Sequence, residues 1–419
     1  MSKYNFPRVV VTGMGALTPI GNNVDEFWQG LIEGRNGCDM LTGFDTTNFV
    51  TKFGCEVKNF DPLQYVNRKE VQRMDKFTIF AMAAAEMCMQ HSKLDLSKTD
   101  LERCGVIVGS GIGGMETYEK QHAGLLARNG DPSKISPFFI PMLILDIMPG
   151  HIAIKYGFKG VNYATVSACS TSTHAIANAV VHIQRGDADV ILTGGSEAVL
   201  TPMGVGGFNA LKALSTRNDD PKTASRPFDK DRDGFVMGEG AGILMLENLD
   251  HALARNATIY AEIAGVGLTD DAFHITQPAA NGEGAARSMK TAIKDAGLKP
   301  EDVDYINAHG TSTPPNDINE TAAIKTVFGE HAYKMNISST KSMTGHLLGA
   351  TGAIEAIATI KAIENSIVPP TINLFEADEK CDLNYTPMKP VKRNIDVALS
   401  NTFGFGGHNA TLCIKKYKA

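Results

Sequence analysis

The sequence predicts an α/β fold built from two duplicated halves, and two observations carry this prediction. Runs that are typical of strands alternate with helical stretches along the chain, as they do in α/β proteins. Three patterns also occur twice in the same order, which indicates a duplication. We therefore expect residues 1–255 and 256–419 to form two related halves, with mostly parallel strands and helices on the sheet faces.

The three repeated patterns differ in kind, so their shared order is informative. The first is an apolar strand with two glycines. The second joins a helix end to a strand and a small-residue loop, and the third joins a strand through a polar turn to an Ala-rich helix. The matched segments are 8–19 (Gly13, Gly15) and 259–270 (Gly265, Gly267), 93–114 and 295–313, and 162–186 and 335–362.

The expected elements follow this repeat. Continuous apolar runs such as VVVTG and VIVGS are typical of strands covered on both faces. The stretches 111–160 and 200–240 have no counterpart of equal length and are interpreted as insertions that carry substrate contacts. We expect strands at 9–12, 105–109, 189–193, 259–264, 303–308 and 336–339, and helices at 76–92, 170–186, 284–297 and 350–364.

Composition excludes several classes of protein. With 419 residues, 43% of them hydrophobic, and a net charge of −6, the chain is typical of a globular enzyme and not of a disordered chain or a nucleic-acid binder. No apolar run reaches 18 residues, so no membrane span is expected. The seven cysteines include no CxxC pair, which disfavours a disulfide framework or zinc ribbon and favours a reducing cytoplasm.

Cys169 is the first candidate for chemistry. It lies between a predicted strand and an Ala-rich helix, in the polar turn 166–172. The serines and threonine just after it can cap that helix, which would place the thiol at a helix N-terminus. Unpaired N–H groups there favour a thiolate, so the pattern predicts a nucleophile. We expect the other six cysteines to be buried and structural.

Two histidines follow predicted strands of the second half. His309 comes directly after the strand at 303–308, and His346 lies at the start of the last long helix. The repeat makes residues 341–346 the counterpart of the Cys169 turn. All three groups are therefore expected to meet at one end of neighbouring strands, where open α/β sheets place their ligands.

A cysteine with two histidines is compatible with three kinds of site. A metal site is the first, although no HxH or HExxH pair is present. A thiol protease is the second and requires an orienting Asn or Asp. The third is acyl transfer followed by carbon–carbon bond formation, in which neutral imidazoles hydrogen-bond an enolate oxygen. Spacing alone does not choose among them.

Glycine-rich loops narrow the choice. Residues 403–409 form a predicted sharp turn whose backbone N–H groups can approach a site as oxyanion donors. Three other loops only approximate known motifs: 13–15 lacks the third glycine of GxGxxG, 109–114 lacks GK[ST], and 194–198 misses GxSxG by its last residue. Nucleotide binding and a serine-hydrolase elbow are therefore disfavoured.

Taken together, these motifs resemble those of the elongating, type II β-ketoacyl-acyl carrier protein synthases, the condensing enzymes of bacterial fatty-acid synthesis. The match covers nearly the whole chain and includes VVVTGMGALTPIG, GSGIGG, VSACSTSTHAI, GDADVILTGGSEA, NAHGTSTP, SSTKSMTGHLLGA and NTFGFGGHN. The resemblance implies a thiolase-like five-layer αβαβα fold, an acyltransferase activity and a homodimer.

The resemblance also implies roles for individual residues. Cys169 would accept the acyl group, while His309 and His346 would promote malonyl decarboxylation and stabilise the enolate. Backbone N–H groups of Cys169 and Phe405 would form the oxyanion hole, with the Phe405 ring as a gate. The other implied positions, for which structural packing is the alternative, are Lys341 and Glu355 as an ion pair beside the site, Thr311 and Thr313 on the phosphopantetheine arm, Ile112 and Phe208 in the acyl pocket, and Phe139 in the partner subunit's pocket.

The implied cycle needs no metal or redox cofactor, because decarboxylation of malonyl-carrier protein supplies the carbanion. Carrier proteins of this kind are acidic, so a local basic patch is expected to dock them. The densest candidate is Arg68, Lys69, Arg73 and Lys76, with Lys212 elsewhere, and a merely solvated helix face is the alternative.

Several other interpretations compete with this one. A polyketide ketosynthase would have the same fold and chemistry. A thiolase is disfavoured because His408 stands where thiolases have a second cysteine, and His346 disfavours the initiating type III synthases. A catalytically silent binding subunit and a Cys/His2 zinc protein are the alternatives from other classes. Pro315 after Pro314 departs from the residues common in relatives.

Overall fold

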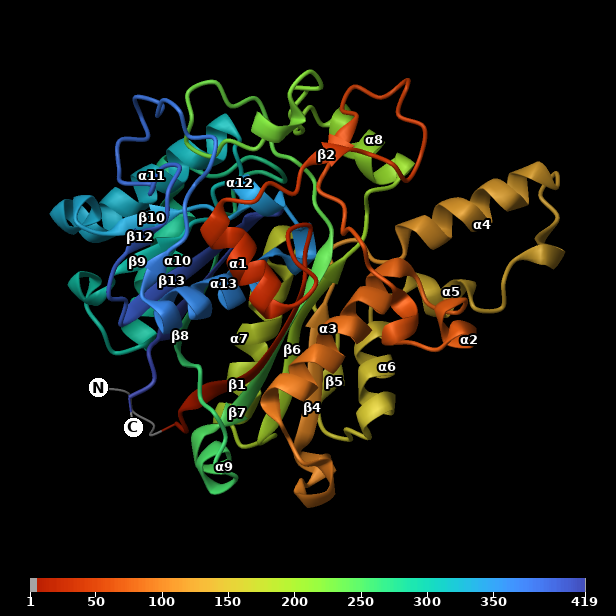
Figure 1. Ribbon diagram of the computed structural model, residues 1–419, viewed down its shortest axis with the longest axis horizontal. Coiled ribbons are helices and arrows are strands. Elements are labelled where there is room, and N and C mark those ends of the chain that lie inside the picture. Colours follow the sequence, from red (N-terminus) through yellow and green to blue (C-terminus); the bar gives the residue numbers. More distant parts are fainter. Residues whose placement is uncertain (1–5, 419) are drawn as a thin grey trace.

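The computed structural model describes residues 6–418 as a layered α/β fold (Figure 1). Its main sheet has the strand order β10-β9-β13-β14-β8-β1-β7-β6-β4-β5. The two halves meet where β1 pairs with β8, and the order outward from that pair is equivalent on both sides. The bounds are β1 (Val9–Leu17), β4 (Cys104–Gly109), β5 (Asn162–Tyr163), β6 (Val190–Glu197), β7 (Gly240–Asn248), β8 (Ala261–Asp270), β9 (Tyr305–Asn307), β10 (Asn336–Ser338), β13 (Val397–Gly404) and β14 (His408–Lys415).

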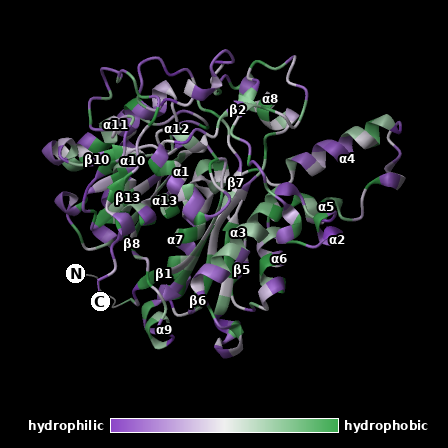
Figure 2. Ribbon diagram, viewed as in Figure 1, coloured by the Kyte–Doolittle hydropathy of each residue, from purple (hydrophilic) through white to green (hydrophobic). Residues whose placement is uncertain are grey.

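Helices complete five layers around these two half-sheets. In the middle layer, α7 (Thr171–Gln184) and α13 (Thr351–Asn365) pack against each other and against both half-sheets. One outer layer consists of α3 (Lys76–Ser92) and α6 (Ile147–Tyr156), and the other of α10 (Glu283–Asp295) and α11 (Pro314–Phe328). Buried apolar clusters lie between the layers, and Figure 2 shows green and white segments gathered in this interior.

The remaining elements are shorter or peripheral. The helices are α1 (Val24–Glu33), α2 (Arg68–Val71), α4 (Met115–Ala127), α5 (Phe139–Leu143), α8 (Pro202–Ala210), α9 (Leu249–Ala254) and α12 (Lys341–Thr344). Two-residue strands occur at β2 (Asp39–Met40), β3 (Phe53–Gly54), β11 (Ile367–Val368) and β12 (Val391–Lys392). None of the helices in residues 6–418 is long and apolar enough to cross a membrane.

The expectation of mostly parallel strands is wrong. The pairs of β4 with β5 and β6, and of β9 with β10 and β13, are parallel, but β7, β1, β8 and β14 all pair antiparallel with their neighbours. The six predicted strands did not include β5, β7, β13 or β14. In β7 the apolar run 243–246 has no periodicity that separates a strand from a buried helix. Each half is therefore a mixed sheet.

The repeated glycines have the same packing function in both halves. A Cβ at Gly15 would lie 2.0 Å from the backbone oxygen of Ala84 in α3, and a Cβ at Gly267 would lie 2.0 Å from the backbone oxygen of Ser288 in α10. Real Cβ atoms do not approach a carbonyl oxygen this closely. Glycine is needed at these positions because an outer helix lies directly on the strand in each half.

We expect Gly15→Ala to lower the free energy of unfolding by about 2–3 kcal/mol, since the added methyl group forces α3 away from β1. Urea unfolding followed by circular dichroism measures this change. The control is Gly207→Ala in α8, where no atom lies within 4 Å of the added Cβ. That exposed helix position should gain roughly 0.5–1 kcal/mol, and equal effects of the two changes would contradict the packing argument.

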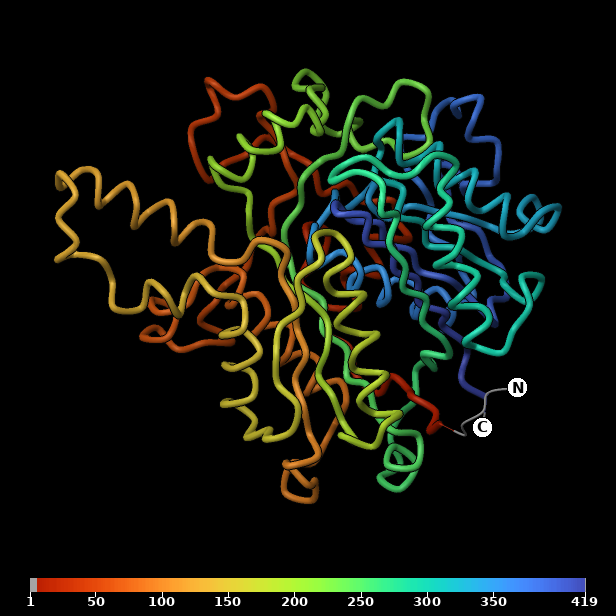
Figure 3. The backbone as a smooth tube through the Cα atoms, turned by 180° about the vertical axis from the view of Figure 1, so that it is seen from behind, coloured from red at the N-terminus to blue at the C-terminus, as the bar shows by residue number. Residues whose placement is uncertain are grey.

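The two predicted insertions lie together on the side of the molecule that carries the cavity described below. The segment 111–160 contains α4, which projects from the body in Figures 1 and 3, followed by α5 and α6. The segment 200–240 contains α8 and irregular loops. Leu211, Lys212, Asp233 and Phe235 from this second segment line the cavity, as does Ile112 from the first. The interpretation as a site-forming insertion agrees with this placement for the second segment, whereas the first contributes only Gly111 and Ile112 and no residue of α4, α5 or α6 lines the cavity.

Candidate active site

Cys169 lies in a tight turn that leads into α7. Ala168 has a left-handed backbone with φ of 49°, and residues 168–170 form a 3₁₀ turn that continues into the helix. The predicted helix start is confirmed, but the predicted side-chain cap is wrong, because Ser170 caps no helical N–H. Its hydroxyl donates instead to backbone carbonyl groups of β13 and β14. The nucleophile turn is thus bound to a hairpin of the other half.

The second half repeats this turn at residues 348–350. Leu348 has φ of 47°, and the turn leads into α13 as 168–170 leads into α7. The structural counterpart of Cys169 is therefore Gly349. The sequence repeat had placed this counterpart at residues 341–346, a few residues too early. The two turns are in contact, so the predicted meeting of the helix starts is confirmed. The backbone N–H of Gly349 donates to the buried carboxylate of Glu197 at 2.9 Å.

His346 is held in one tautomer by the turn that follows it. The backbone N–H of Leu348 donates to Nδ1 at 3.2 Å, and the Thr351 hydroxyl lies 2.9 Å from the same nitrogen. Burial, and then the charge of Lys341, lowers the pKa of His346 well below 6.5, so the ring is neutral. A neutral imidazole that accepts at Nδ1 carries its proton on Nε2. That Nε2 has no partner among the described residues, so it is free to donate to a substrate.

His309 follows β9 and is positioned through its backbone. Its N–H and that of Gly310 donate to the two carboxylate oxygens of buried Glu320, at 2.9 and 2.8 Å. Burial lowers the pKa of His309 well below 6.5, and the charge of Lys341 lowers it further. Its Nδ1 has no partner among the described residues. The side chain is 2% exposed, so a neutral imidazole with an unused nitrogen lies in a nearly dry site.

Lys341 and Glu355 form the ion pair that the resemblance implied. Lys341 Nζ lies 2.5 Å from one oxygen of Glu355, and both side chains are 2% exposed. Burial raises the pKa of Glu355 to about 7, although the ammonium group of Lys341 opposes this. The same ammonium group lowers the pKa of both histidines. The ammonium group of Lys341 therefore helps to keep the two imidazoles neutral.

The thiol lies against these imidazoles. Cys169 Sγ and one ring nitrogen of each histidine lie within 4.8 Å of one another. The expectation that the helix start makes Cys169 a thiolate is wrong: burial raises the pKa of the thiol to about 11, although the charge of Lys341 and the backbone N–H of Phe405 lower it. Desolvation destabilises the thiolate by more free energy than Lys341 and the Phe405 N–H contribute to its stability. The resting group is a thiol.

We expect the alkylation rate of Cys169 by iodoacetamide to rise about tenfold per pH unit from pH 7 to 10, because the thiolate fraction does so below a pKa of about 11. Peptide mapping by mass spectrometry isolates this cysteine from the other six. Free glutathione, treated in parallel, should level off near its ordinary thiol pKa. A plateau for Cys169 below pH 8 would instead restore the thiolate that the sequence predicted.

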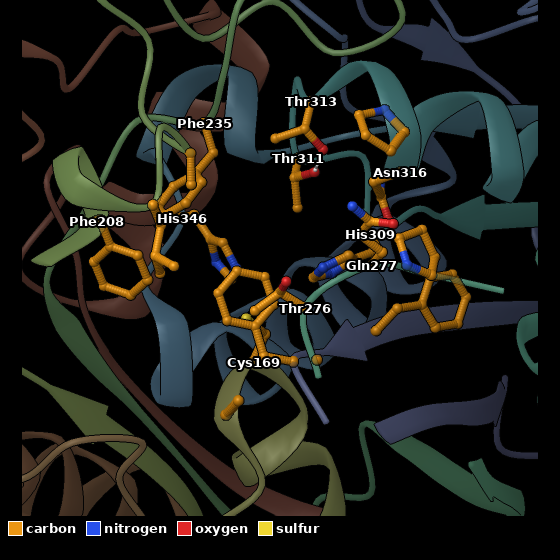
Figure 4. A pocket seen from close by; sticks show the side chains of 18 of the residues that line it. Cys169, Phe208, Phe235, Thr276, Gln277, His309, Thr311, Thr313, Asn316 and His346 are labelled. Atoms are coloured by element: carbon orange, nitrogen blue, oxygen red, sulfur yellow. Dashed lines mark hydrogen bonds between the residues drawn. The ribbon is translucent and has the colours of Figure 1, made fainter. Parts of the chain in front are cut away.

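The three groups lie at one end of a cavity of about 470 Å³. In Figure 4, Cys169 is at the lower end, Thr311 and Thr313 are at the upper end, and Phe208 is on the side opposite His309. The hydroxyl groups of Thr311 and Thr313 lie 2.9 Å apart, and both residues line the cavity. The end opposite Cys169 thus offers hydroxyl groups, and the side that carries Phe208 is apolar.

Of the other predicted residues, three line the cavity and one does not. Ile112, Phe208 and Phe405 line the cavity, and the rings of Phe208 and Phe405 lie 6.5 Å apart. Phe139 begins α5 and does not line the cavity of its own chain.

The predicted docking residues are also separated. Lys212 lines the cavity, whereas Arg68 and Lys69 are exposed on α2. Arg73 lies over the ring of Phe138, and Lys76 is bound to buried Glu239, so Lys76 is not a free basic group.

Sequence reasoning missed two buried carboxylates and one loop of the site. Glu197 lies in the segment 194–198, which belongs to one of the motifs of the resemblance but received no role of its own, and Glu320 carried no local signal. Thr276 and Gln277 line the cavity from the loop after β8. No spacing rule connects these residues to the catalytic candidates, even for Glu320, which follows His309 by 11 residues.

The Cys169–His309–His346 cluster also has the chemistry of a metal site. Thiolate and imidazole are zinc ligands, and a tetrahedral zinc ion holds its ligand atoms roughly 3.3–3.6 Å apart. The three ligand atoms, within 4.8 Å of one another, are compatible with that geometry. It is the only such group of three among residues 6–418. Geometry alone therefore leaves a metal site open, and comparison with known proteins bears on the choice.

Residues 7–252 match the family model described as Beta-ketoacyl synthase, N-terminal domain, and residues 260–375 match Beta-ketoacyl synthase, C-terminal domain. The chain belongs to the β-ketoacyl synthase family. This β-ketoacyl synthase is 53% identical, over 100% of both chains, to the 3-oxoacyl-[acyl-carrier-protein] synthase 2 of Synechocystis sp.. It is 52% identical to the enzyme of that name from Staphylococcus aureus, over 98% of this chain and 99% of the relative.

Solved structures support the fold of this β-ketoacyl synthase. One is a type II PKS acyl-carrier protein in complex with its ketosynthase bound to the hexaketide. It is 36% identical to this chain with a TM-score of 0.92, and the match covers 99% of this chain and 100% of that one. The thiolase-like fold from two duplicated halves is therefore confirmed.

Proposed function

We propose that this chain is an elongating 3-oxoacyl-[acyl-carrier-protein] synthase that extends fatty acids by two carbons. The observation that carries the proposal is the convergence of the Cys169 thiol with two neutral imidazoles at the end of one cavity. Full-length identity of 52–53% to synthases of that name supports the fatty-acid pathway. The polyketide alternative has weaker support, since the polyketide ketosynthase is 36% identical.

In the first half-reaction, the Cys169 sulfur attacks the thioester carbon of an acyl-carrier protein. The new S–C bond forms, the bond to the phosphopantetheine sulfur breaks, and the thiol proton leaves with that sulfur. The backbone N–H groups of Cys169 and Phe405 hold the developing oxyanion. The repeat supports this role, because the equivalent N–H of Gly349 already binds an anion, the Glu197 carboxylate.

In the second half-reaction, malonyl-carrier protein loses CO₂, and the electron pair of the broken C–C bond becomes an enolate. His346 donates its Nε2 proton in a hydrogen bond to the enolate oxygen, and His309 provides the second contact. Their low pKa values suit this role, since a neutral imidazole does not protonate the carbanion. The carbanion attacks the Cys169 thioester, a new C–C bond forms, and the thiolate leaves and takes up one proton from solvent.

The same proposal assigns the rest of the site. Thr311 and Thr313 bind the phosphopantetheine arm, Ile112 and Phe208 bind the acyl chain, and Phe405 gates the second substrate. Residues 1–255 supply the nucleophile and residues 256–419 the two histidines. We propose a homodimer in which Phe139 of α5 reaches the partner subunit's pocket.

Intact-mass analysis tests the proposal directly. The protein is incubated with a long-chain acyl-carrier protein, and peptide mapping locates the residue that carries the acyl group. Malonyl-carrier protein is then added. We expect an acyl adduct on Cys169 that is discharged as a β-ketoacyl product. Zinc is measured in the same preparation. Equimolar zinc without an adduct would overturn the proposal and favour the metal site.

Carrier-protein docking gives a second expected result. Charge reversal in Arg68→Glu and Lys69→Glu should raise the KM for acyl-carrier protein about fivefold to tenfold with little change in kcat, because these exposed cations attract an acidic partner. Steady-state kinetics at low salt measures the effect. Lys290→Glu, an exposed lysine on α10, is the matched control. An unchanged KM in the α2 variants would remove α2 from the docking surface.

A further inference from the structure

Glu197 is a buried carboxylate with an unusual number of donors. Its Oε1 accepts from the Ser110 hydroxyl at 2.8 Å and from the backbone N–H groups of Ile112 and Gly113 at 3.1 and 3.4 Å. Its Oε2 accepts from the N–H groups of Gly111 and Gly349 at 2.8 and 2.9 Å. The side chain is 0% exposed and has no cationic partner among its hydrogen bonds.

Three successive N–H groups, of residues 111–113, therefore point at one carboxylate. Such a concave run of N–H groups is an anion-binding arrangement, and here the anion is part of the chain itself. The opposite side of the loop carries Ile112, which lines the cavity and packs with the apolar cluster that contains Leu348 and Val205. The carboxylate thus holds the loop from behind while the loop presents Ile112 to the cavity.

The carboxylate also joins this loop to the turn before α13. A Cβ at Gly349 would lie 2.3 Å from the backbone nitrogen of Gly111 and 2.7 Å from Glu197 Oε2. The two backbones therefore approach as closely as glycine allows. One side chain fixes the acyl-pocket loop relative to the segment that carries His346.

We infer that Glu197 is a positioning residue that sets the acyl-chain selectivity of the synthase by holding the 110–113 loop against the cavity. The inference rests on the proposed function, because it takes the Ile112 side of the cavity as the acyl pocket. It assigns no contact between Glu197 and substrate. Its effect is carried by the loop.

The variant Glu197→Gln affects the hydrogen bonds of the two carboxylate oxygens differently. Around Oε2 there are only N–H donors, whereas around Oε1 the Ser110 hydroxyl can turn to accept. The amide must therefore keep its oxygen toward Gly111 and Gly349 and turn its NH₂ toward Ser110. The bond to the His346 segment is retained, and the bonds to Ile112 and Gly113 are lost.

The test measures both half-reactions of the full-length variant. We expect kcat/KM for acyl transfer from a twelve-carbon acyl-carrier protein to fall about tenfold or more, with at most a threefold fall for a four-carbon donor and for malonyl decarboxylation. The control is Glu247→Gln in β7. It changes a fully buried carboxylate that is bound to Arg255 and does not line the cavity, so all three rates should stay unchanged.

The outcomes are distinguishable. An equal loss for both chain lengths and for decarboxylation, or no loss at all, would overturn the inference. If the variant does not fold, Ser110→Ala loosens the same loop without altering the buried carboxylate, and a smaller fall confined to the long chain is expected. An absent acyl adduct in the unmodified protein would instead overturn the proposed function, and the inference with it.

Discussion

Replacing Cys169 with alanine is expected to remove the acyl adduct completely and to lower the condensation rate by on the order of 10⁴ or more. The reason is that the acyl group must leave the first carrier protein before the second one can enter the single cavity. Without the thiol, no other described group among the cavity-lining residues can hold the acyl group as a thioester. Adduct formation by mass spectrometry and product formation by chromatography measure the two effects.

The matched control is Cys413→Ala, which removes a buried thiol from β14 outside the cavity. It should retain the adduct and nearly all condensation activity. Decarboxylation of malonyl-carrier protein should continue in Cys169→Ala, because the two imidazoles remain. A variant that loses decarboxylation as completely as condensation would contradict the separation of the two half-reactions.

Replacing His309 with alanine is expected to have the second largest effect. Removal of one donor from a preorganised anion site costs about 10²–10³ in rate, and this loss should fall on malonyl decarboxylation, measured as released CO₂. Acyl transfer to Cys169 should change by less than about tenfold, since its oxyanion is held by backbone N–H groups. The two half-reactions are measured separately.

His182→Ala is the control for this variant. That histidine bonds to Tyr163 and Asp187 near the end of α7, away from the cavity, and should leave both half-reactions unchanged. Loss of acyl transfer in His309→Ala together with retained decarboxylation would reverse the proposed roles. The same result would make His309 a base for the thiol, whose pKa of about 11 leaves it protonated at rest.

Local patterns predicted much of the fold because the duplication repeats short-range signals. The expected helix at 76–92 agrees with α3 in both bounds, and the expected helix at 350–364 is α13 to within one residue. The partner of each strand was harder to predict from the sequence, because the direction of pairing depends on where distant segments return to the sheet. For that reason the sheet proved mixed where mostly parallel strands were expected.

The candidate site also has features that local patterns predicted and features that they did not. Cys169, His309 and His346 were recognisable because each lies in a polar or small-residue turn next to a predicted strand or helix start. The protonation state of the thiol was not recognisable. The position at a helix start predicted a thiolate. Burial against the 403–409 loop and the second half has the larger effect on the pKa and keeps Cys169 a thiol.

The sequence by itself determined the fold class, the duplication and the three groups that converge, because residue type, spacing and glycine placement are local properties. Only the tertiary structure decided the mixed sheet, the neutral imidazoles, the protonated thiol and the role of Glu197. These depend on desolvation and on hydrogen bonds between segments far apart in the chain, such as the 152 residues that separate Glu197 from Gly349. Charge states and anchoring contacts are set by what surrounds a group, and the surroundings exist only in the folded protein.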